Sequence, residues 1–155
     1  MKKLISIIGT TGIGKTKLAI EIAKHFETEI ISCDSRQFFA EMKIGTATPS
    51  EEELAAVPHH FIGHLSVENY YSIGQFEKEA LQKIEDLFQK HEVVIMVGGS
   101  MMYEKAVLEG LNDLPEADEK NQKELERIFA EEGIENLQKI LQDLDPDYFE
   151  TVDKD

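Results

Sequence analysis

The glycine-rich segment near the start of the chain has the residue types and spacing of a phosphate site. The pattern G-x-x-x-x-G-K-S/T is matched by Gly9-Thr10-Thr11-Gly12-Ile13-Gly14-Lys15-Thr16. Successive backbone N–H groups of such a loop point inward and form an anion site at the start of a helix. Lys15 adds a cation for the outer phosphates, and the Thr16 hydroxyl can join the shell of a Mg²⁺ ion. We expect this loop to bind a phosphorylated ligand; a glycine-rich turn without a ligand is the alternative.

One carboxylate, Asp34, follows a predicted strand and is expected near this loop. A P-loop ATPase usually has an acidic residue at the end of a second apolar strand, but the strand predicted at 93–97 ends in Gly98-Gly99-Ser100. Asp34 could steer a Mg²⁺-bound water or accept a proton from an incoming nucleophile. The alternative is that Asp34 only caps the turn that follows it.

Several histidine, cysteine and methionine side chains are expected to have structural rather than catalytic roles. Three histidines lie close together in the sequence: His59, His60 and His64. They lack a fourth zinc ligand, so we expect them to pack or hydrogen-bond within their loop. Cys33 has no evident activating base and is expected to be a small buried apolar side chain. Met101 and Met102 are expected to fill the core at the start of a helix.

The elements that must position these residues alternate between strand and helix. Nearly continuous apolar runs predict strands at 3–8, 29–32 and 93–97. Helical spacing of apolar residues predicts helices at 17–25, 72–90 and 101–109, with a possible short helix at 51–56. This alternation is typical of an α/β fold, and we expect a P-loop-type parallel sheet flanked by helices.

The region 44–71 has no such periodicity and is expected to be a long functional loop. It contains Gly45, Pro49 and Pro58 among several polar residues. The segment Ser72-Ile-Gly-Gln75 then has the residue types of a capping box and is expected to start the helix at 72–90.

The chain changes character after residue 112. We expect an incomplete P-loop α/β core at 1–112, and a small helical insertion at 113–155 with helices at 118–132 and 134–141. The net charge of −15 divides into −5 over residues 1–110 and −10 over residues 111–155. Such acidity disfavours general polyanion binding, although the first two thirds can hold a local anion site. No closing strand follows the last helix, so the chain is expected to be truncated at its C-terminus.

Length and composition favour a cytoplasmic globular protein. The chain has 155 residues, 41% of them hydrophobic and 30% charged, and a single cysteine. It therefore contains no internal disulfide framework, which favours a reducing compartment. The apolar runs are too short for a membrane span or for a signal peptide.

An ordered series of short motifs resembles the tRNA dimethylallyltransferases, also called tRNA isopentenyltransferases. After the Gly9–Thr16 loop, the series comprises Asp34-Ser35-Arg36-Gln37, Ile44-Gly45-Thr46-Ala47, Val57-Pro58-His59-His60, Val97-Gly98-Gly99-Ser100 and Leu108-Glu109-Gly110-Leu111. The resemblance extends over essentially the whole chain and is looser over 115–150. Ser100 stands where the family usually has threonine, and Thr10 replaces a common proline.

The resemblance implies transfer of a dimethylallyl group from its diphosphate to N6 of an adenine beside the tRNA anticodon. By this resemblance, Asp34 and Lys15 are the catalytic residues, and the Gly9–Thr16 loop holds the diphosphate with Mg²⁺ near Thr16. Residues implied to contact tRNA are Asp34, Ser35, Arg36, Gln37, Ser100 and Gln122. The adenine would have to flip out of its stack. The implied partners are the tRNA anticodon arm and dimethylallyl diphosphate, with no membrane, and the full-length enzyme is expected to be a monomer.

Two other functions remain open from the residues alone. The same loop could bind ATP in a small-molecule kinase, with Asp34 directing an acceptor hydroxyl. The chain could also be an inactive phosphate-binding fragment.

Overall fold

A parallel four-stranded sheet forms the centre of the first part of the chain. The computed structural model describes residues 1–111 and 118–153, and the sheet contains β1 (Lys3–Ile8), β2 (Ile30–Ser32), β3 (His59–His60) and β4 (Val93–Gly98). The strand order is β1-β4-β2-β3, and all three pairings are parallel. The loops that follow β1, β2 and β4 therefore leave the same edge of the sheet, which brings Gly9, Asp34 and Gly99 together.

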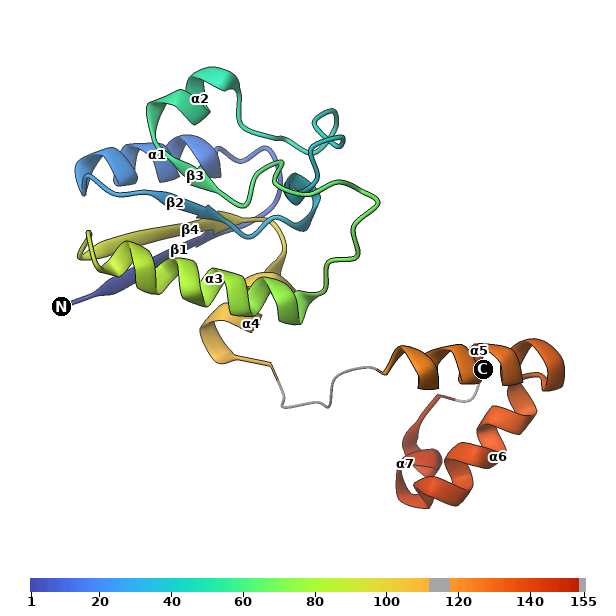
Figure 1. Cartoon of the computed structure of the whole chain (residues 1–155). Helices are drawn as coiled ribbons and strands as arrows, with labels where there is room; N and C mark the ends of the chain where they lie inside the picture. Colours follow the sequence, from blue (N-terminus) through green and yellow to red (C-terminus); the bar gives the residue numbers. More distant parts are fainter. Residues whose placement is uncertain (112–117, 154–155) are drawn as a thin grey trace. The chain divides into compact units, whose positions relative to one another are not determined.

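Helices cover both faces of this sheet (Figure 1). On one face lie α1 (Lys15–His25) and α2 (Glu51–Ala56), and on the other lie α3 (Ile73–Phe88) and α4 (Met101–Glu109). The first face buries three residues of α1 against the strands: Ala19, Ile20 and Ala23. The second buries four residues of α3: Phe76, Ala80, Ile84 and Leu87. Each large apolar side chain buried in this way contributes about 1.5–3 kcal/mol. The predicted α/β fold with a parallel sheet is confirmed.

Phe38 anchors the turn that carries the residues after β2. It ends the short 3-10 helix η1 (Ser35–Phe38) and is 1% exposed. Its ring stacks on Phe76 at 5.1 Å and meets the edges of Tyr103 at 5.4 Å and Tyr71 at 5.6 Å. Since these rings belong to α3, α4 and the segment before α3, the core fixes the position of residues 34–37.

Several sequence-based expectations need correction. Helix α1 begins at Lys15, two residues earlier than predicted, because the helix follows directly on the glycine loop. Ser72 caps α3 by accepting from Gln75 N at 3.1 Å, but the Gln75 amide donates to Glu79 at 3.0 Å and does not complete the box. Met101 and Met102 begin α4 as expected, yet they are 71% and 64% exposed, so their assignment to the core is wrong.

The second part of the chain is helical. Its helices are α5 (Glu119–Glu132), α6 (Ile134–Leu144) and α7 (Pro146–Thr151), and none of their residues is fully buried. The chain divides into two compact units, Met1–Asn112 and Asp113–Asp155. On α5, the Arg127 guanidinium bonds both Glu124 and Glu131 along the solvated face. No helix among the described residues is long and apolar enough to cross a membrane.

Candidate active site

The Gly9–Thr16 loop joins β1 to the N-terminus of α1. Gly12 and Gly14 have φ values of 87° and 93°, in the left-handed region that glycine adopts without strain. A Cβ on either residue would meet nothing within 4 Å, so the backbone conformation and not the available space requires glycine there. The free N–H groups at the start of α1 and the helix dipole make the loop a site for an anion.

The Lys15 side chain folds back over its own loop. Its ammonium donates to the Thr10 carbonyl at 2.7 Å. Lys15 nevertheless lines the cavity beside the loop, together with Thr11 and Thr16. Lys15 therefore borders the cavity beside the loop in which the sequence predicts a phosphate group.

Asp34 uses its two carboxylate oxygens differently. Oδ1 accepts from Arg36 N at 3.2 Å and caps η1, as the alternative sequence interpretation predicted. Oδ2 lies beside Gly99: a Cβ on Gly99 would be 3.3 Å from Oδ2 and 4.0 Å from Thr11 Oγ1. Capping thus occupies one oxygen, while the other lies beside Gly99, and Asp34 lines the same two cavities as Thr11.

Close packing beneath Asp34 explains the glycine that ends β4. Cys33 is fully buried and donates its N–H to the Val97 carbonyl at 2.9 Å. A Cβ on Gly98 would lie only 2.6 Å from Cys33 Sγ, so no larger residue fits. Burial raises the pKa of the Cys33 thiol to about 12, with Glu104 and Asp34 adding to the effect through their charges. The expectation of a buried, unreactive cysteine is confirmed.

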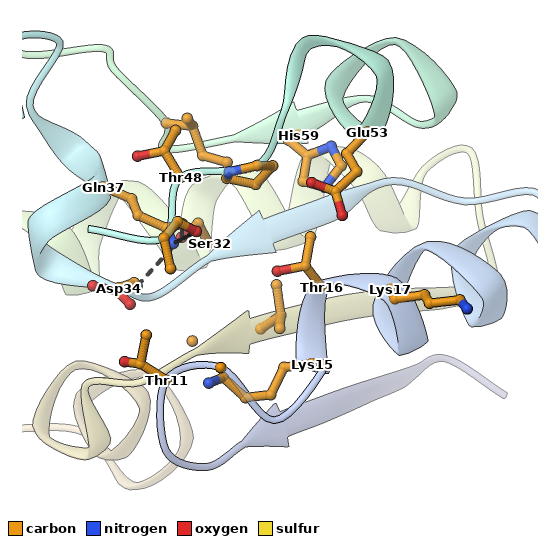
Figure 2. A pocket seen from close by; sticks show the side chains of 17 residues that line it. Thr11, Lys15, Thr16, Lys17, Ser32, Asp34, Gln37, Thr48, Glu53 and His59 are labelled. Carbon is orange, nitrogen blue, oxygen red and sulfur yellow. Dashed lines mark hydrogen bonds between the residues drawn. The ribbon is translucent and has the colours of Figure 1, made fainter. Parts of the chain in front are cut away.

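Two cavities meet at Asp34 and Thr11. The first has a volume of about 360 Å³, and its lining includes Asp34, Gln37, Glu53 and His59 together with six residues at and after the loop: Thr11, Gly12, Gly14, Lys15, Thr16 and Lys17. The second, of about 440 Å³, is lined by eight residues: Thr11, Asp34, Ser35, Arg36, Gly45, Thr46, Gly99 and Ser100. Figure 2 shows Asp34 and Thr11 at one end of the first cavity, with Glu53 and His59 at the other. A group bound at the loop and a group in the second cavity would approach each other beside Asp34.

Gln37 closes the first cavity by joining two segments. Its Oε1 accepts from Ser32 Oγ at 3.1 Å, and its Nε2 donates to the carbonyls of Ala47 at 3.1 Å and Thr46 at 3.4 Å. Both ends of this amide are therefore used to hold residues 46–47 against β2.

Ser35 and Ser100 join the loops after β2 and β4. Ser100 Oγ accepts from Ser35 N at 3.2 Å and lies 3.2 Å from Ser35 Oγ. Both line the second cavity with Arg36, the one basic side chain among its eight lining residues. Ser100 thus supplies the hydroxyl that accepts the hydrogen bond from Ser35 N.

The three histidines occupy different environments. His59 Nδ1 donates to the Val57 carbonyl at 2.7 Å, whereas its buried Nε2 has no hydrogen-bond partner among the described residues. Burial lowers the pKa of His59 and favours the neutral ring. His60 bonds Glu29 at 2.6 Å, and the His64 ring packs against Phe38 and Phe61. The expected hydrogen bonding and loop packing of these histidines are confirmed.

The first cavity offers oxygen donors suited to a magnesium ion. The Thr16 hydroxyl and the carboxylates of Asp34 and Glu53 line it. Within residues 1–111 and 118–153, no three acidic, histidine or cysteine side chains are grouped closely enough to hold a metal alone. Mg²⁺ typically keeps waters and takes phosphate oxygens alongside one or two protein ligands, so these residues fit that ion.

Some of the residues predicted from sequence lie outside these cavities. Gly9, Thr10 and Ile13 do not line either one, and the Ile13 side chain is 63% exposed. Gln122 lies on α5 in the second unit, where its Nε2 donates to Glu126 at 3.0 Å. The remaining site residues come together around Asp34.

Comparison with known proteins places this chain in a family. The family model described as IPP transferase matches residues 37–155. This chain belongs to the IPP transferase family. A protein from Christiangramia forsetii named tRNA dimethylallyltransferase is 57% identical over 150 residues, covering 97% of this chain and 50% of that protein. A protein of the same name from Flavobacterium johnsoniae is 51% identical over 152 residues, covering 98% and 49%.

Solved IPP transferase relatives share the fold. The full-length tRNA isopentenylpyrophosphate transferase from Bacillus halodurans is 33% identical, with a TM-score of 0.70 over 99% of this chain and 51% of that one. A eukaryotic dimethylallyltransferase, described as acting on tRNA, is 28% identical with a TM-score of 0.81 over 99% of this chain and 38% of its own. This IPP transferase chain therefore spans about half the length of the bacterial relatives, or less in the eukaryotic one.

Sequence reasoning named three residues of this IPP transferase site, Gly98, Gly99 and Gln37, but missed their roles in packing and hydrogen bonding. Gly98 and Gly99 leave space for Cys33 and Asp34, respectively. Gln37 donates a hydrogen bond to the Ala47 carbonyl and so holds residues 46–47. The two successive glycines at the end of the predicted strand 93–97 were a sequence signal for the close packing at Gly98 and Gly99. No sequence pattern indicated the partners of Gln37.

Proposed function

We propose that this chain carries the donor-binding and catalytic half of a tRNA dimethylallyltransferase. The proposal depends most on one observation: Asp34 lines both the cavity at the Gly9–Thr16 loop and the cavity formed by Ser35, Arg36 and Ser100. The donor diphosphate would bind at the loop, and the acceptor adenine would enter the second cavity after leaving its stack. Similarity to proteins with that name supports the assignment.

The proposed reaction is a displacement at an allylic carbon. The adenine N6 attacks the carbon that bears the diphosphate, a C–N bond forms, and the C–O bond to the leaving diphosphate breaks. The N6 proton passes to Asp34 Oδ2, the oxygen that does not cap η1. Lys15 and the N–H groups of the loop balance the charge that develops on the diphosphate.

Several further assignments belong to this proposal. Mg²⁺, when bound beside Thr16, would neutralise diphosphate charge. Ser35, Arg36 and Ser100 would contact the acceptor side, and Gln37 would hold the cavity wall. Residues 113–155 would form the helical insertion of a P-loop-type core, with Gln122 facing tRNA. We propose that the enzyme acts in the cytoplasm as a monomer.

The ligand that stabilises this chain most distinguishes the transferase from the alternative functions. Dimethylallyl diphosphate at about 100 times its Kd should stabilise this chain by roughly 2.7 kcal/mol in thermal unfolding. ATP and inorganic diphosphate serve as comparison ligands in the same thermal unfolding measurement. A preference for ATP would instead favour a kinase, and no response to any of the three would indicate an inactive fragment.

We expect turnover to require the polypeptide that the relatives carry beyond the matched half. We therefore define a chimera in which this chain replaces the matching half of the C. forsetii relative. Transfer of the dimethylallyl group to tRNA by this chimera, with loss of the N6 proton, is the direct test of the activity.

A further inference from the structure

A third cavity adjoins the cavity at the Gly9–Thr16 loop. Its volume is about 370 Å³, close to the 360 Å³ of the first cavity. Four residues line both cavities: Gln37, Thr48, Pro49 and Ile62. Because these four residues border both spaces, they form a partition between them.

The partition faces the phosphate-binding side of the first cavity. Figure 2 shows Thr11 and Lys15 on the loop side and Gln37 and Thr48 on the opposite side. The proposed function places the donor diphosphate at the loop, and the present inference rests on it. The hydrocarbon chain of a donor bound in this way would extend away from the loop, toward the partition.

The third cavity suits an isoprenoid chain because several apolar side chains line it. Beyond the partition, its lining includes Phe39, Ala40 and Leu54. Phe39 packs against the core cluster beneath α3, and Leu54 lies partly buried on α2. Burial of hydrocarbon against such side chains is favourable. A donor chain that passed the partition would therefore find a favourable environment behind it.

Hydrogen bonds hold most of the partition in place. Gln37 Nε2 donates to the Ala47 carbonyl at 3.1 Å, and Thr48 Oγ1 lies 2.8 Å from Thr46 Oγ1. The residue after Pro49 forms the capping box that starts α2. This side of the partition is therefore fixed by the fold before any ligand binds.

The Ile62 side chain is the part of the partition that comes from the segment after β3. On one side of it, Phe61 has a φ of 63° and packs against the core cluster beneath α3. On the other side, Gly63 donates its N–H to the Gln37 carbonyl at 2.8 Å. Ile62 itself lines both cavities and is only partly buried. Shortening its side chain would widen the passage between the cavities without removing a hydrogen bond.

We propose that the partition limits the donor to one isoprene unit, and that Ile62 is the residue that closes the way into the third cavity. The chain of dimethylallyl diphosphate would end in front of Ile62. The chain of geranyl diphosphate is longer by one isoprene unit and would collide with Ile62. Ile62 is thus a specificity-determining residue that takes no part in the chemical step.

Calorimetric titration of this chain with each of the two allylic diphosphates, in the presence of Mg²⁺, tests the partition. The measured quantity is the ratio of the two Kd values, because a general loss of affinity leaves that ratio unchanged. We expect the unaltered chain to prefer dimethylallyl diphosphate by at least about tenfold, and Ile62→Ala to reduce this preference by at least about tenfold. Leu54→Ala is the matched control: it removes as many carbons, but from the third cavity alone, and should leave the ratio unchanged.

A double variant tests whether the third cavity takes the added isoprene unit. Leu54→Phe fills part of that cavity, so we expect its combination with Ile62→Ala to restore the preference for dimethylallyl diphosphate. Circular dichroism checks that each variant folds. Should Ile62→Ala not fold, Ile62→Val replaces it and should shift the ratio in the same direction by a smaller factor.

The outcomes separate this inference from the function on which it rests. Tight binding of dimethylallyl diphosphate with an unchanged ratio in Ile62→Ala would overturn the inference alone. An equal shift in Leu54→Ala, or no restoration in the double variant, would do the same. If neither allylic diphosphate bound more tightly than inorganic diphosphate, the proposed function and the inference would both be wrong.

Discussion

Gly99 lies between the Asp34 carboxylate and the Gly9 carbonyl at the start of the phosphate loop. A Cβ at position 99 would lie 3.3 Å from Asp34 Oδ2 and 3.8 Å from the Gly9 carbonyl oxygen. Such a contact is tighter than most side chains tolerate, although the glycine backbone is unstrained there. The absence of a side chain at residue 99 therefore leaves the space that Asp34 Oδ2 needs in its present position.

Gly99→Ala should displace the Asp34 carboxylate by a few tenths of an ångström. Misplacement of a reacting group by about 1 Å can cost about 10²-fold, so we expect a loss of up to that size in the chimera. Single-turnover transfer measures the effect, and the melting temperature should change little. An unchanged rate of transfer would show that the close contact between residue 99 and Asp34 does not determine where the carboxylate lies.

Asp34→Asn should stop proton acceptance and keep the shape of the site. Asparagine can still cap η1, because its side-chain oxygen can accept from Arg36 N as Asp34 Oδ1 does. We expect nearly unchanged affinity for dimethylallyl diphosphate and a fall in transfer of about 10²–10⁴-fold. Donor titration and single-turnover kinetics on one preparation separate the two effects. Near-normal transfer would remove Asp34 from the proton path.

Lys15→Ala should weaken donor binding and slow transfer. The ammonium that now bonds the Thr10 carbonyl would no longer reach the diphosphate, and such charges contribute a few kcal/mol, or about 10²–10³-fold in rate. Lys17→Ala is the matched control, since Lys17 lines the same cavity beyond the loop motif. Equal effects of the two variants on donor affinity would mean that Lys15 has no special role.

Glu29 should make stability depend on pH in the acidic range. Burial by itself would raise the pKa of Glu29, but hydrogen bonds and charges from His60 and His91 outweigh it and hold that pKa below the ordinary 4.5. A lowered folded-state pKa adds stability above the unfolded-state value, which is lost as the pH falls through the folded-state value. Glu29→Gln should therefore flatten the fall in melting temperature below about pH 4.5.

Glu85→Gln on the exposed surface of α3 is the control for this measurement. Its acid profile should follow that of the unchanged chain. If Glu29→Gln also followed it, the contacts of Glu29 with the two histidines would not contribute to stability.

Elements with a strong apolar pattern could be predicted from the sequence. The limits of β1 and α4 match the prediction, because an apolar run defines β1, helically spaced apolar residues define α4, and a glycine follows each element. Strand β3 was missed because His59–His60 is short and polar and forms only through pairing with β2. Met101 and Met102 were misplaced because apolarity alone does not reveal whether another element covers a residue.

The candidate site could be predicted in part. The Gly9–Thr16 pattern and the acid after β2 placed Lys15, Thr16 and Asp34 on one edge, and the structure brings them to one cavity. The bonds of Gln37 to residues 46–47 and the space that Gly98 leaves for Cys33 are contacts between distant segments, which no local pattern encodes. The roles of the site residues in the reaction stay predictions.

The packing of Cys33 beneath Gly98 has a consequence for oxidative damage. Only the thiolate reacts readily with peroxides and alkylating agents. Burial raises the pKa of the Cys33 thiol to about 12, so the thiol is protonated at neutral pH. Cys33 is also fully buried, so reagents do not reach it in the folded chain. The residue next to Asp34 is thus shielded from sulfenic acid formation, and oxidants should leave this part of the site intact.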